Sequence, residues 1–259
     1  MKSKISIVLL LSLVVCLCAF TTLSQGEEQK PQLLMVEEAI VPPANSQDYE
    51  AVLKEFLKGF EKYKWPYPFR VYMDYDFHYY FSYPMKDFAE VEKVFSVWEE
   101  IVQKWGPDKV AGMMKRMGDA FQHNNFVLMY AVPELSYEPA NPRLKEEERK
   151  FIMWDIWYPI SGREAEVEGI FKKIKEIVKS KNINIGFVGY RGVIGAEMPA
   201  YMTVGYGKDI ADFWGNLSKM WDMIGEEFFT TFNEGLSLLR KRDLRMGLYR
   251  PDLSYMPKE

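Results

Sequence analysis

The sequence predicts an α+β fold made of two copies of one βαββαβ unit, and three observations support this prediction. The same order of apolar strands and amphipathic helices occurs in residues 33–137 and again in residues 151–255. Both stretches close on nearly the same phrase, Pro-Glu-Leu-Ser-Tyr in the first and Pro-Asp-Leu-Ser-Tyr in the second. The phrases start at positions 133 and 251, and this spacing of 118 residues is too long for a solenoid repeat and suits a duplicated small domain.

Each half opens with a short apolar strand that stops at a proline. Residues 33–41 precede Pro42, and residues 151–158 precede Pro159. Proline cannot continue a central strand, so both strands end sharply. A helix follows in each half, because apolar side chains then recur every three or four residues. These helical stretches are 49–63 and 167–178.

The next stretch of each half predicts two strands joined by a turn. Residues 69–84 alternate strictly, with apolar side chains at odd positions and polar or aromatic ones at even positions. We expect the odd face to pack on the helices and the even face to look toward an interior lumen or toward solvent. The counterpart strands of the second half are 186–194 and 201–207.

A long second helical region and a closing strand complete each half. The helical pattern breaks at Gly106-Pro107 in the first half and near Gly225 in the second. The basic run Arg240-Lys241-Arg242 follows the last helical stripe, and we interpret it as a solvated helix end. The order is therefore βαββαβ twice, the order of a ferredoxin-like unit. The closing strands are 126–132 and 245–250.

A ferredoxin-like unit covers one face of its sheet with helices and leaves the other face needing a partner, which the second copy supplies. The repeat order, the split second helix and the aromatic strands make the chain resemble the dimeric α/β-barrel superfamily. This superfamily includes NIPSNAP-like proteins, antibiotic-biosynthesis monooxygenases, EthD-like proteins and the haem-binding chlorite dismutases. The resemblance covers nearly all of residues 33–255 and implies a pseudo-dimeric α/β barrel, in which two sheets face each other around a small-molecule cavity. No catalytic signature of a member family is matched.

The N-terminus predicts export. Lys2 and Lys4 precede an apolar run over 5–20, and the chain then turns polar, which is the pattern of a secretory signal. We expect residues 1–24 to be a signal peptide and the mature protein to be periplasmic or extracellular, with no membrane span after cleavage. The stretch ending at Cys16 resembles a bacterial lipobox, which gives lipid anchoring through Cys16 as an alternative.

Composition argues against two classes of function. The formal net charge of −4 becomes −6 when residues 1–24 are removed, because they hold two lysines and no acid. An acidic chain is a poor partner for nucleic acid, which is bound by clustered Lys and Arg. Both cysteines, Cys16 and Cys18, lie in the signal segment, so the mature chain has no thiol chemistry. The polar residues 138–150 are expected to link the two repeats.

The even positions of the first hairpin supply the first candidate site residues. His78, Asp74 and Tyr72, with Glu38 from the first strand, are the catalytic candidates, because imidazole, carboxyl and phenol groups can transfer protons in a lumen. The alternative is an ordinary wetted sheet face. The residues expected to bind a ligand are Arg70, Tyr80, Trp154, Asp155 and Arg191.

Two acids occupy apolar first strands. Glu38 and Asp155 fall at matching positions when the prolines that end these strands are aligned. A buried carboxylate is costly unless it is paired or hydrogen-bonded. The pattern is consistent with a functional carboxylate with a raised pKa, with a salt bridge to Arg70 or Arg191, or with plain exposure at a strand end.

The sequence predicts no cofactor and no metal site. It holds two histidines, His78 and His123, and they are not at metal-ligand spacing. Haem, which the resemblance brings in as an alternative, would need one of them as its axial ligand. His123 follows a helical stripe, where a polar helix end explains it without a cofactor.

We therefore expect an exported protein that binds a small apolar or aromatic molecule in a cavity between two facing sheets. The first alternative is an enzyme of the cofactor-independent monooxygenase type or a haem-dependent enzyme. The second is a non-catalytic assembly module, in which an exposed aromatic face forms a protein interface and the chain forms an oligomer.

Overall fold

A computed structural model describes residues 30–195 and 197–257. The expected signal peptide and Cys16 lie outside these residues. The strands are β1 (Gln32–Ile40), β2 (Arg70–Asp74), β3 (His78–Met85), β4 (His123–Ala131), β5 (Phe151–Pro159), β6 (Phe187–Ile194), β7 (Tyr201–Gly207) and β8 (Leu239–Tyr249). The helices are α1 (Ser46–Tyr63), α2 (Phe88–Trp105), α3 (Pro107–Ala120), α4 (Glu164–Ser180), α5 (Ile210–Ile224) and α6 (Glu226–Leu236), and short 3-10 turns span Pro43–Asn45, Pro133–Leu135 and Glu146–Glu148.

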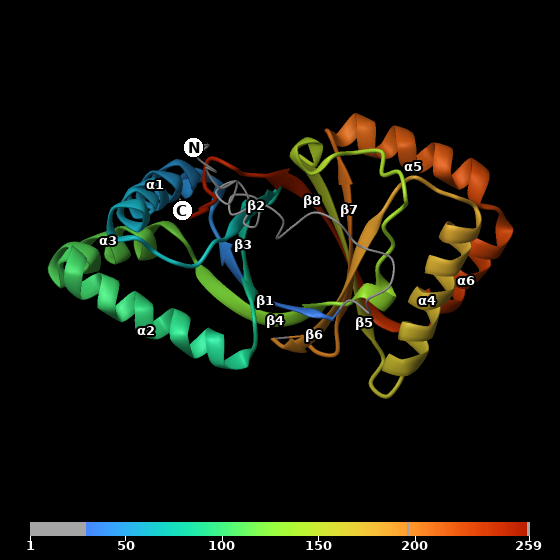
Figure 1. Cartoon of the computed structure of the whole chain (residues 1–259), viewed down its shortest axis with the longest axis horizontal. Helices are drawn as coiled ribbons and strands as arrows, with labels where there is room; N and C mark the ends of the chain where they lie inside the picture. The colour runs from blue at the N-terminus through green and yellow to red at the C-terminus, as the bar shows by residue number, and fades with distance from the viewer. Residues whose placement is uncertain (1–29, 196, 258–259) are drawn as a thin grey trace, which may run out of the picture.

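The eight strands form one closed barrel in the order β1-β3-β2-β8-β5-β7-β6-β4, and all neighbouring strands are antiparallel. Repeat 1 (β1–β4 with α1–α3) and repeat 2 (β5–β8 with α4–α6) each supply half of the wall. They meet where β2 pairs with β8 and where β4 pairs with β6. The helices of repeat 1 cover one side of the barrel and those of repeat 2 cover the other (Figure 1). The predicted α+β fold with a pseudo-dimeric barrel is confirmed.

The hydrophobic core lies between the outer face of the barrel and the helices. In repeat 1 the odd-numbered side chains Val71, Tyr79 and Phe81 are buried there, as the alternation predicts. In repeat 2 the indole of Trp157 is buried between α4 and α6, against Phe171 and Phe232. Both halves therefore use one face of each strand for stability and leave the other face to line the interior.

The strand registers reveal an internal two-fold axis. In β1 and β3, Leu33 faces Met85, and in β5 and β7, Phe151 faces Gly207. An offset of 118 residues carries β1 onto β5, β2 onto β6 and β4 onto β8, and an offset of 122 carries β3 onto β7. Strand direction alternates around the ring, so β1 and β5 run the same way along the barrel. The two-fold axis therefore coincides with the barrel axis, and equivalent residues lie at the same height on opposite walls.

The basic run was predicted to end a helix, and this prediction was wrong. Helix α6 ends at Leu236, and Arg240, Lys241 and Arg242 belong to β8. Strand β8 pairs with β5 over almost its whole length, and backbone pairing does not depend on which side chains the strand carries. Charged side chains can occupy it because they alternate in direction and find partners on both faces.

None of the helices within the described residues combines the length and the apolar character needed to cross a membrane.

Candidate functional site

The interior of the barrel holds a cavity of about 330 Å³ that is lined by side chains from all eight strands. This volume lies in the range of small-molecule pockets. Of the even-numbered face of the first hairpin, Tyr72, His78, Tyr80 and Ser82 line this lumen. The other lining residues are Leu34, Val36, Glu38, Ile40, Asn125, Val127, Met129, Ile152, Trp154, Ile156, Tyr158, Tyr190, Gly192, Glu197, Met198, Ala200, Tyr201, Met202, Val204, Tyr206 and Arg245.

Five side chains form a hydrogen-bonded group that we name the lumen cluster: Glu38, Asp74, His78, Tyr80 and Arg245. Arg245 Nη1 donates to Glu38 Oε1 and to the Tyr80 hydroxyl, at 2.5 Å each. The Tyr80 hydroxyl donates to Asp74 Oδ2 at 2.8 Å. His78 Nδ1 lies 3.2 Å from Glu38 Oε1 and 3.6 Å from Asp74 Oδ2. Residues from β1, β2, β3 and β8 thus converge on one part of the lumen wall.

Asp74 is the most deeply buried member of the lumen cluster. Its residue is 3% exposed, and Oδ1 accepts hydrogen bonds from the backbone N–H groups of Asp76 and His78. These bonds tie the carboxylate to the turn between β2 and β3. Because Oδ2 accepts from Tyr80, the turn also fixes where the phenol stands.

The environment of the lumen cluster shifts the pKa of its acid and its imidazole in opposite directions. Burial alone would raise the pKa of Glu38, but hydrogen bonds with His78 and Asn125 and the charge of Arg245 lower that pKa to about 2. The hydrogen bond to Glu38 raises the pKa of His78; burial opposes it, and the negative charges of Asp74 and Glu38 add to it. Glu38 is therefore held ionised and His78 is held toward the imidazolium form.

The phenol of Tyr80 stays neutral. Burial raises the pKa of Tyr80, the nearby carboxylates of Asp74 and Glu38 raise it further, and Arg245 lowers it only in part. The pKa of Arg245 is also raised, because Tyr80 and Glu38 outweigh the effect of burial. Tyr80 is therefore a neutral hydrogen-bonding group beside a permanent cation.

An aromatic wall extends from the lumen cluster along the lumen. The Trp154 ring centroid lies 5.1 Å from that of Tyr80 and 6.2 Å from that of Tyr72, in an edge-on contact with Tyr72. Tyr190 and Tyr206 pack on the same group of side chains. Aromatic faces of this kind suit planar apolar ligands, since offset and edge-on ring contacts stabilise beyond the area they bury.

The opposite wall of the lumen is apolar. The two-fold relates Glu38 to Ile156, Asp74 to Gly192, His78 to Ala200, Tyr80 to Met202 and Arg245 to Val127. These five equivalent residues all line the same cavity, at the height of the lumen cluster. They are Ile156, Gly192, Ala200, Met202 and Val127. At the height of the lumen cluster, the lumen therefore has one charged side and one apolar side, although the backbone around it is nearly symmetric.

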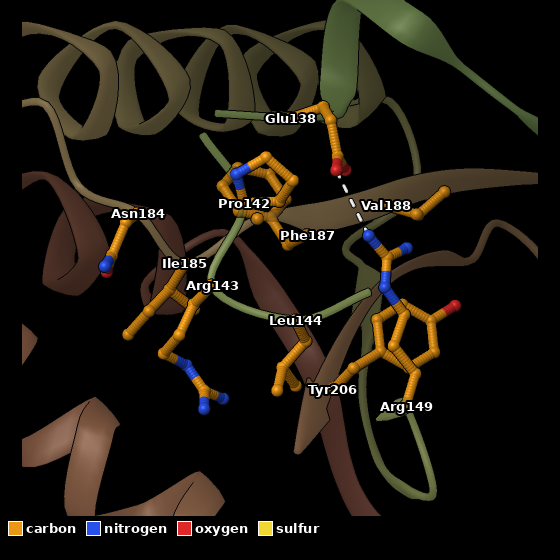
Figure 2. Close-up of a pocket in the computed structure, with 11 residues that line it drawn as sticks. Glu138, Pro142, Arg143, Leu144, Arg149, Asn184, Ile185, Phe187, Val188 and Tyr206 are labelled. Atoms are coloured by element: carbon orange, nitrogen blue, oxygen red, sulfur yellow. Dashed lines mark hydrogen bonds and ion pairs between the residues drawn. The ribbon is translucent and has the colours of Figure 1, made fainter. Parts of the chain in front are cut away.

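The lumen cluster lies toward the barrel end where β1 and β5 finish, and the segment between the repeats lies at the other end. Lys150 N donates to Gly207 O at the end of β7, and Tyr249 N donates to Lys150 O. Arg149 lies over the ring of Tyr206, 5.3 Å from its centroid, and pairs with Glu138 at 3.1 Å (Figure 2). Tyr206 thus separates the lumen from a small pocket of about 30 Å³ beside this segment.

Three of the residues expected to bind a ligand lie outside the lumen. Asp155 faces the helices, where its carboxylate accepts two hydrogen bonds from Arg242 at 2.7 Å each and one from Trp157 Nε1. Arg191 pairs with Glu168 on the outer surface, at 3.3 Å. Arg70 pairs with Glu146 at the linker end of the barrel. Of the others, Tyr80 and Trp154 line the lumen.

The alignment of Glu38 with Asp155 was wrong by one residue. The strand registers place Glu37 at the position of Asp155, and Glu38 at that of Ile156. A slip of one residue turns a side chain to the other face of the sheet. The predicted partners were wrong as well, because Glu38 pairs with Arg245. Both acids are paired, as the cost of burial demands, but on opposite faces of the barrel wall.

Sequence reasoning missed Arg245 and Asn125, which both donate hydrogen bonds to Glu38. Arg245 was placed at the start of a closing strand and was grouped with the basic run Arg240-Lys241-Arg242, which was interpreted as a solvated helix end. The sequence does contain a sign of its position: Arg245 lies two positions from Gly247 and four from Tyr249, so all three lie on the same face of β8. The register of β8 against β2 and β5 was needed to show that this face is the inner one.

His78 lines the lumen, and its Nδ1 faces the carboxylates of Glu38 and Asp74. His123, at the start of β4, is exposed and does not line the cavity. No group of three or more His, Cys, Asp or Glu side chains within the described residues is arranged to hold a metal ion.

Comparison with known proteins supports the fold and leaves the activity open. No family model matches the chain, and no curated protein matches it. An anthrone oxidase-like protein aligns with a TM-score of 0.57 at 7% identity, over 86% of this chain and 92% of that chain. A mutant chlorite dismutase from Candidatus Nitrospira defluvii aligns at 0.53 and 8%, over 85% and 91%. A proposed monooxygenase from Fusobacterium nucleatum aligns at 0.51 and 11%, over 85% and 92%. The chain thus has the dimeric α/β-barrel fold that the sequence predicted.

Proposed function

We propose that this chain is exported and that its barrel binds one small, neutral, mostly aromatic molecule in the lumen, with a hydroxyl or carbonyl group of the ligand at the lumen cluster. The observation that supports this most is the cavity of about 330 Å³ with hydrogen-bonding groups on one wall and apolar side chains on the other. A ligand with one polar end matches both walls at once.

The charges of the lumen cluster favour a neutral ligand. The carboxylates of Glu38 and Asp74 face the Arg245 cation and His78, so the group has no excess charge when His78 is protonated and no spare positive charge when it is neutral. An anionic ligand would bring an unpaired charge into a largely enclosed site, which is costly. A hydroxyl or carbonyl oxygen, in contrast, can exchange hydrogen bonds with Tyr80 and His78.

The test is isothermal titration calorimetry with three ring-matched probes. We expect 2-naphthol to bind at one molecule per chain and about tenfold more tightly than naphthalene, because it gains one hydrogen bond in the lumen. We expect 2-naphthoate to bind at least about tenfold more weakly than 2-naphthol, because its charge has no spare partner. Equal affinity for all three probes, or several molecules per chain, would count against a defined lumen site.

Two arginines of β8 provide a matched pair of variants for this test. Arg245→Met removes the cation of the lumen cluster and is expected to weaken 2-naphthol binding by about tenfold or more. Arg242→Met removes the partner of Asp155 on the helix-facing side and is expected to leave affinity unchanged in the folded protein. Circular dichroism establishes that each variant is folded. Loss of binding in both variants would place the ligand elsewhere.

A second candidate function is oxidation of such a ligand by dioxygen. It is favoured by the contact of His78 with Glu38 inside the lumen, which pairs a proton carrier with a fixed carboxylate. The structural similarity to an anthrone oxidase-like protein suggests anthrone as the probe. Conversion of anthrone with one O2 gives anthraquinone and one H2O, and it requires removal of the ring proton that His78 would accept when it is neutral.

An oxygen electrode distinguishes binding alone from this reaction. With anthrone, we expect oxygen uptake above the uncatalysed rate, rising as the pH increases and His78 loses its proton. His78→Gln should remove this pH dependence and reduce the rate about a hundredfold, while His123→Gln leaves both unchanged. Binding of 2-naphthol without any catalysed oxygen uptake would support the binding function and remove the enzymatic one.

A further inference from the structure

The turn between β6 and β7 is longer than its counterpart in repeat 1. Three residues separate Asp74 from His78, whereas seven separate the equivalent residues Gly192 and Ala200. This difference of four is the change in repeat offset from 118 to 122. Among the described lumen-lining residues, Glu197 and Met198 come from the longer turn and none comes from the shorter one. The insertion therefore adds Glu197 and Met198 to the lumen lining on the repeat 2 side only.

The side chain of Met198 is seated on two glycines. A Cβ at Gly192 would lie 2.8 Å from both Sδ and Cε of Met198, and a Cβ at Gly195 would lie 2.8 Å from Cε. Any larger residue at these positions would force the thioether to move. Gly192 N also donates to Ala200 O at 2.8 Å, which closes the base of the turn. The glycines of this segment thus make room for a methionine beside the lumen.

Glu197 holds the turn across the rim of the barrel. Its carboxylate accepts hydrogen bonds from Lys241 at 2.8 Å and from Arg240 at 3.4 Å, both on β8. In the strand order, β5 lies between β7 and β8, so the turn between β6 and β7 reaches past one strand to make these contacts. The pairs are partly exposed and individually weak, but together they fix where the neighbouring Met198 lies.

We propose that Met198 sets the upper limit on the size of the molecule that the lumen accepts, and that Glu197 positions it. This inference rests on the proposed binding function. Gly192 and Ala200 are the equivalents of Asp74 and His78, so Met198 borders the wall opposite the lumen cluster. A ligand anchored by its polar end at the lumen cluster would extend toward this side chain. An unbranched methionine suits this position, because it fills irregular space and can adapt to the ligand edge.

The experiment compares two probes that differ by one fused ring, 2-naphthol and 2-anthrol, by calorimetry. Met198→Ala should raise the affinity for 2-anthrol relative to 2-naphthol by about tenfold, because truncation frees the space that the third ring needs. Met198→Leu keeps most of the volume and should keep the wild-type preference. Glu197→Gln should raise the relative affinity for 2-anthrol by a smaller factor, through looser positioning of Met198.

Val204→Ala is the control, because it enlarges the lumen from β7 without touching the turn. An equal gain for 2-anthrol in Val204→Ala and Met198→Ala would overturn the inference, since any added space would then serve. An unchanged preference in Met198→Ala would overturn it as well. If the wild-type protein binds neither probe, the proposed function itself fails. If it binds 2-naphthol and Arg245→Met weakens that binding, but Met198→Ala leaves the preference between the two probes unchanged, only the role of Met198 is wrong.

Discussion

The two walls of the lumen differ far more than the two outer faces of the barrel. On the outside, Tyr79 donates to Glu50 at 2.9 Å in repeat 1, and Tyr201 donates to Glu168 at 2.8 Å at the equivalent place in repeat 2. Inside, Glu38 and Tyr80 of repeat 1 face Ile156 and Met202 of repeat 2, among other unlike pairs.

This difference shows which part of a duplicated domain is free to change. The outer face packs on helices, where volume and pairing are constrained by dense packing. The inner face contacts a cavity, so its side chains can diverge without disturbing the core. The barrel keeps a nearly symmetric frame and carries a single asymmetric site, which favours one bound molecule in one orientation.

The largest expected effect comes from placing an acid on the apolar wall. Ile156→Glu puts a carboxylate at the position equivalent to Glu38, but without the cation and the amide that stabilise Glu38. We expect a loss of about 2–3 kcal/mol in the free energy of unfolding, because a half-buried charge on this wall lacks partners. Urea denaturation at neutral pH measures this loss.

Adding Val127→Arg to this variant supplies the counterpart of Arg245 and sharpens the comparison. The double variant should recover part of the lost free energy, since an arginine at this position can pair across the lumen wall. Ile156→Gln, which has a similar shape and no charge, is the control. No recovery in the double variant would mean that the two halves are not equivalent at this height, contrary to the strand registers.

A smaller effect is expected from titration of His78. Its pKa is raised in the folded protein above the usual 6.5, so its contribution to stability is fully present below pH 6.5 and is lost as the pH rises through the folded pKa. The pKa of Glu38 is lowered from the usual 4.5 to about 2. Its contribution to stability is therefore fully present above pH 4.5 and is lost as the pH falls toward 2. Between these limits, of these two residues only His78 contributes a pH dependence.

We therefore expect the difference in unfolding free energy between the wild-type protein and His78→Gln to be larger at about pH 5.5 than at about pH 8. Denaturation curves at the two pH values measure it, and His123→Gln, at an exposed position, serves as the matched variant. A difference that grows with pH would show that the lumen cluster does not stabilise the imidazolium.

The sequence predicted the fold and one wall of the site because both depend on local patterns. The turn at 75–77 has an odd number of residues, so the even positions of the two strands lie opposite one another, as Tyr72 and Tyr80 do. The alternation over 69–84 therefore describes one face of the whole hairpin. That parity placed Tyr72, His78 and Tyr80 on the face that lines the lumen.

The rest of the site depends on contacts between distant segments. Glu38 and Arg245 are 207 residues apart and meet only when the barrel closes. Strand β8 carries charges on both faces, so hydrophobic alternation gives no sign of which face is inside. Aligning the two first strands by their prolines ignored the ladder register, and a one-residue error was enough to assign Asp155 to the wrong face.

The most direct test of the asymmetric lumen is a crystal structure with 6-bromo-2-naphthol, located by the anomalous signal of its bromine. We expect one molecule of 6-bromo-2-naphthol inside the barrel, with its hydroxyl within hydrogen-bond distance of Tyr80 or His78 and its bromine toward Ile156 and Met202. A bromine beside Glu38 and Arg245, or a molecule bound outside the barrel, would contradict it.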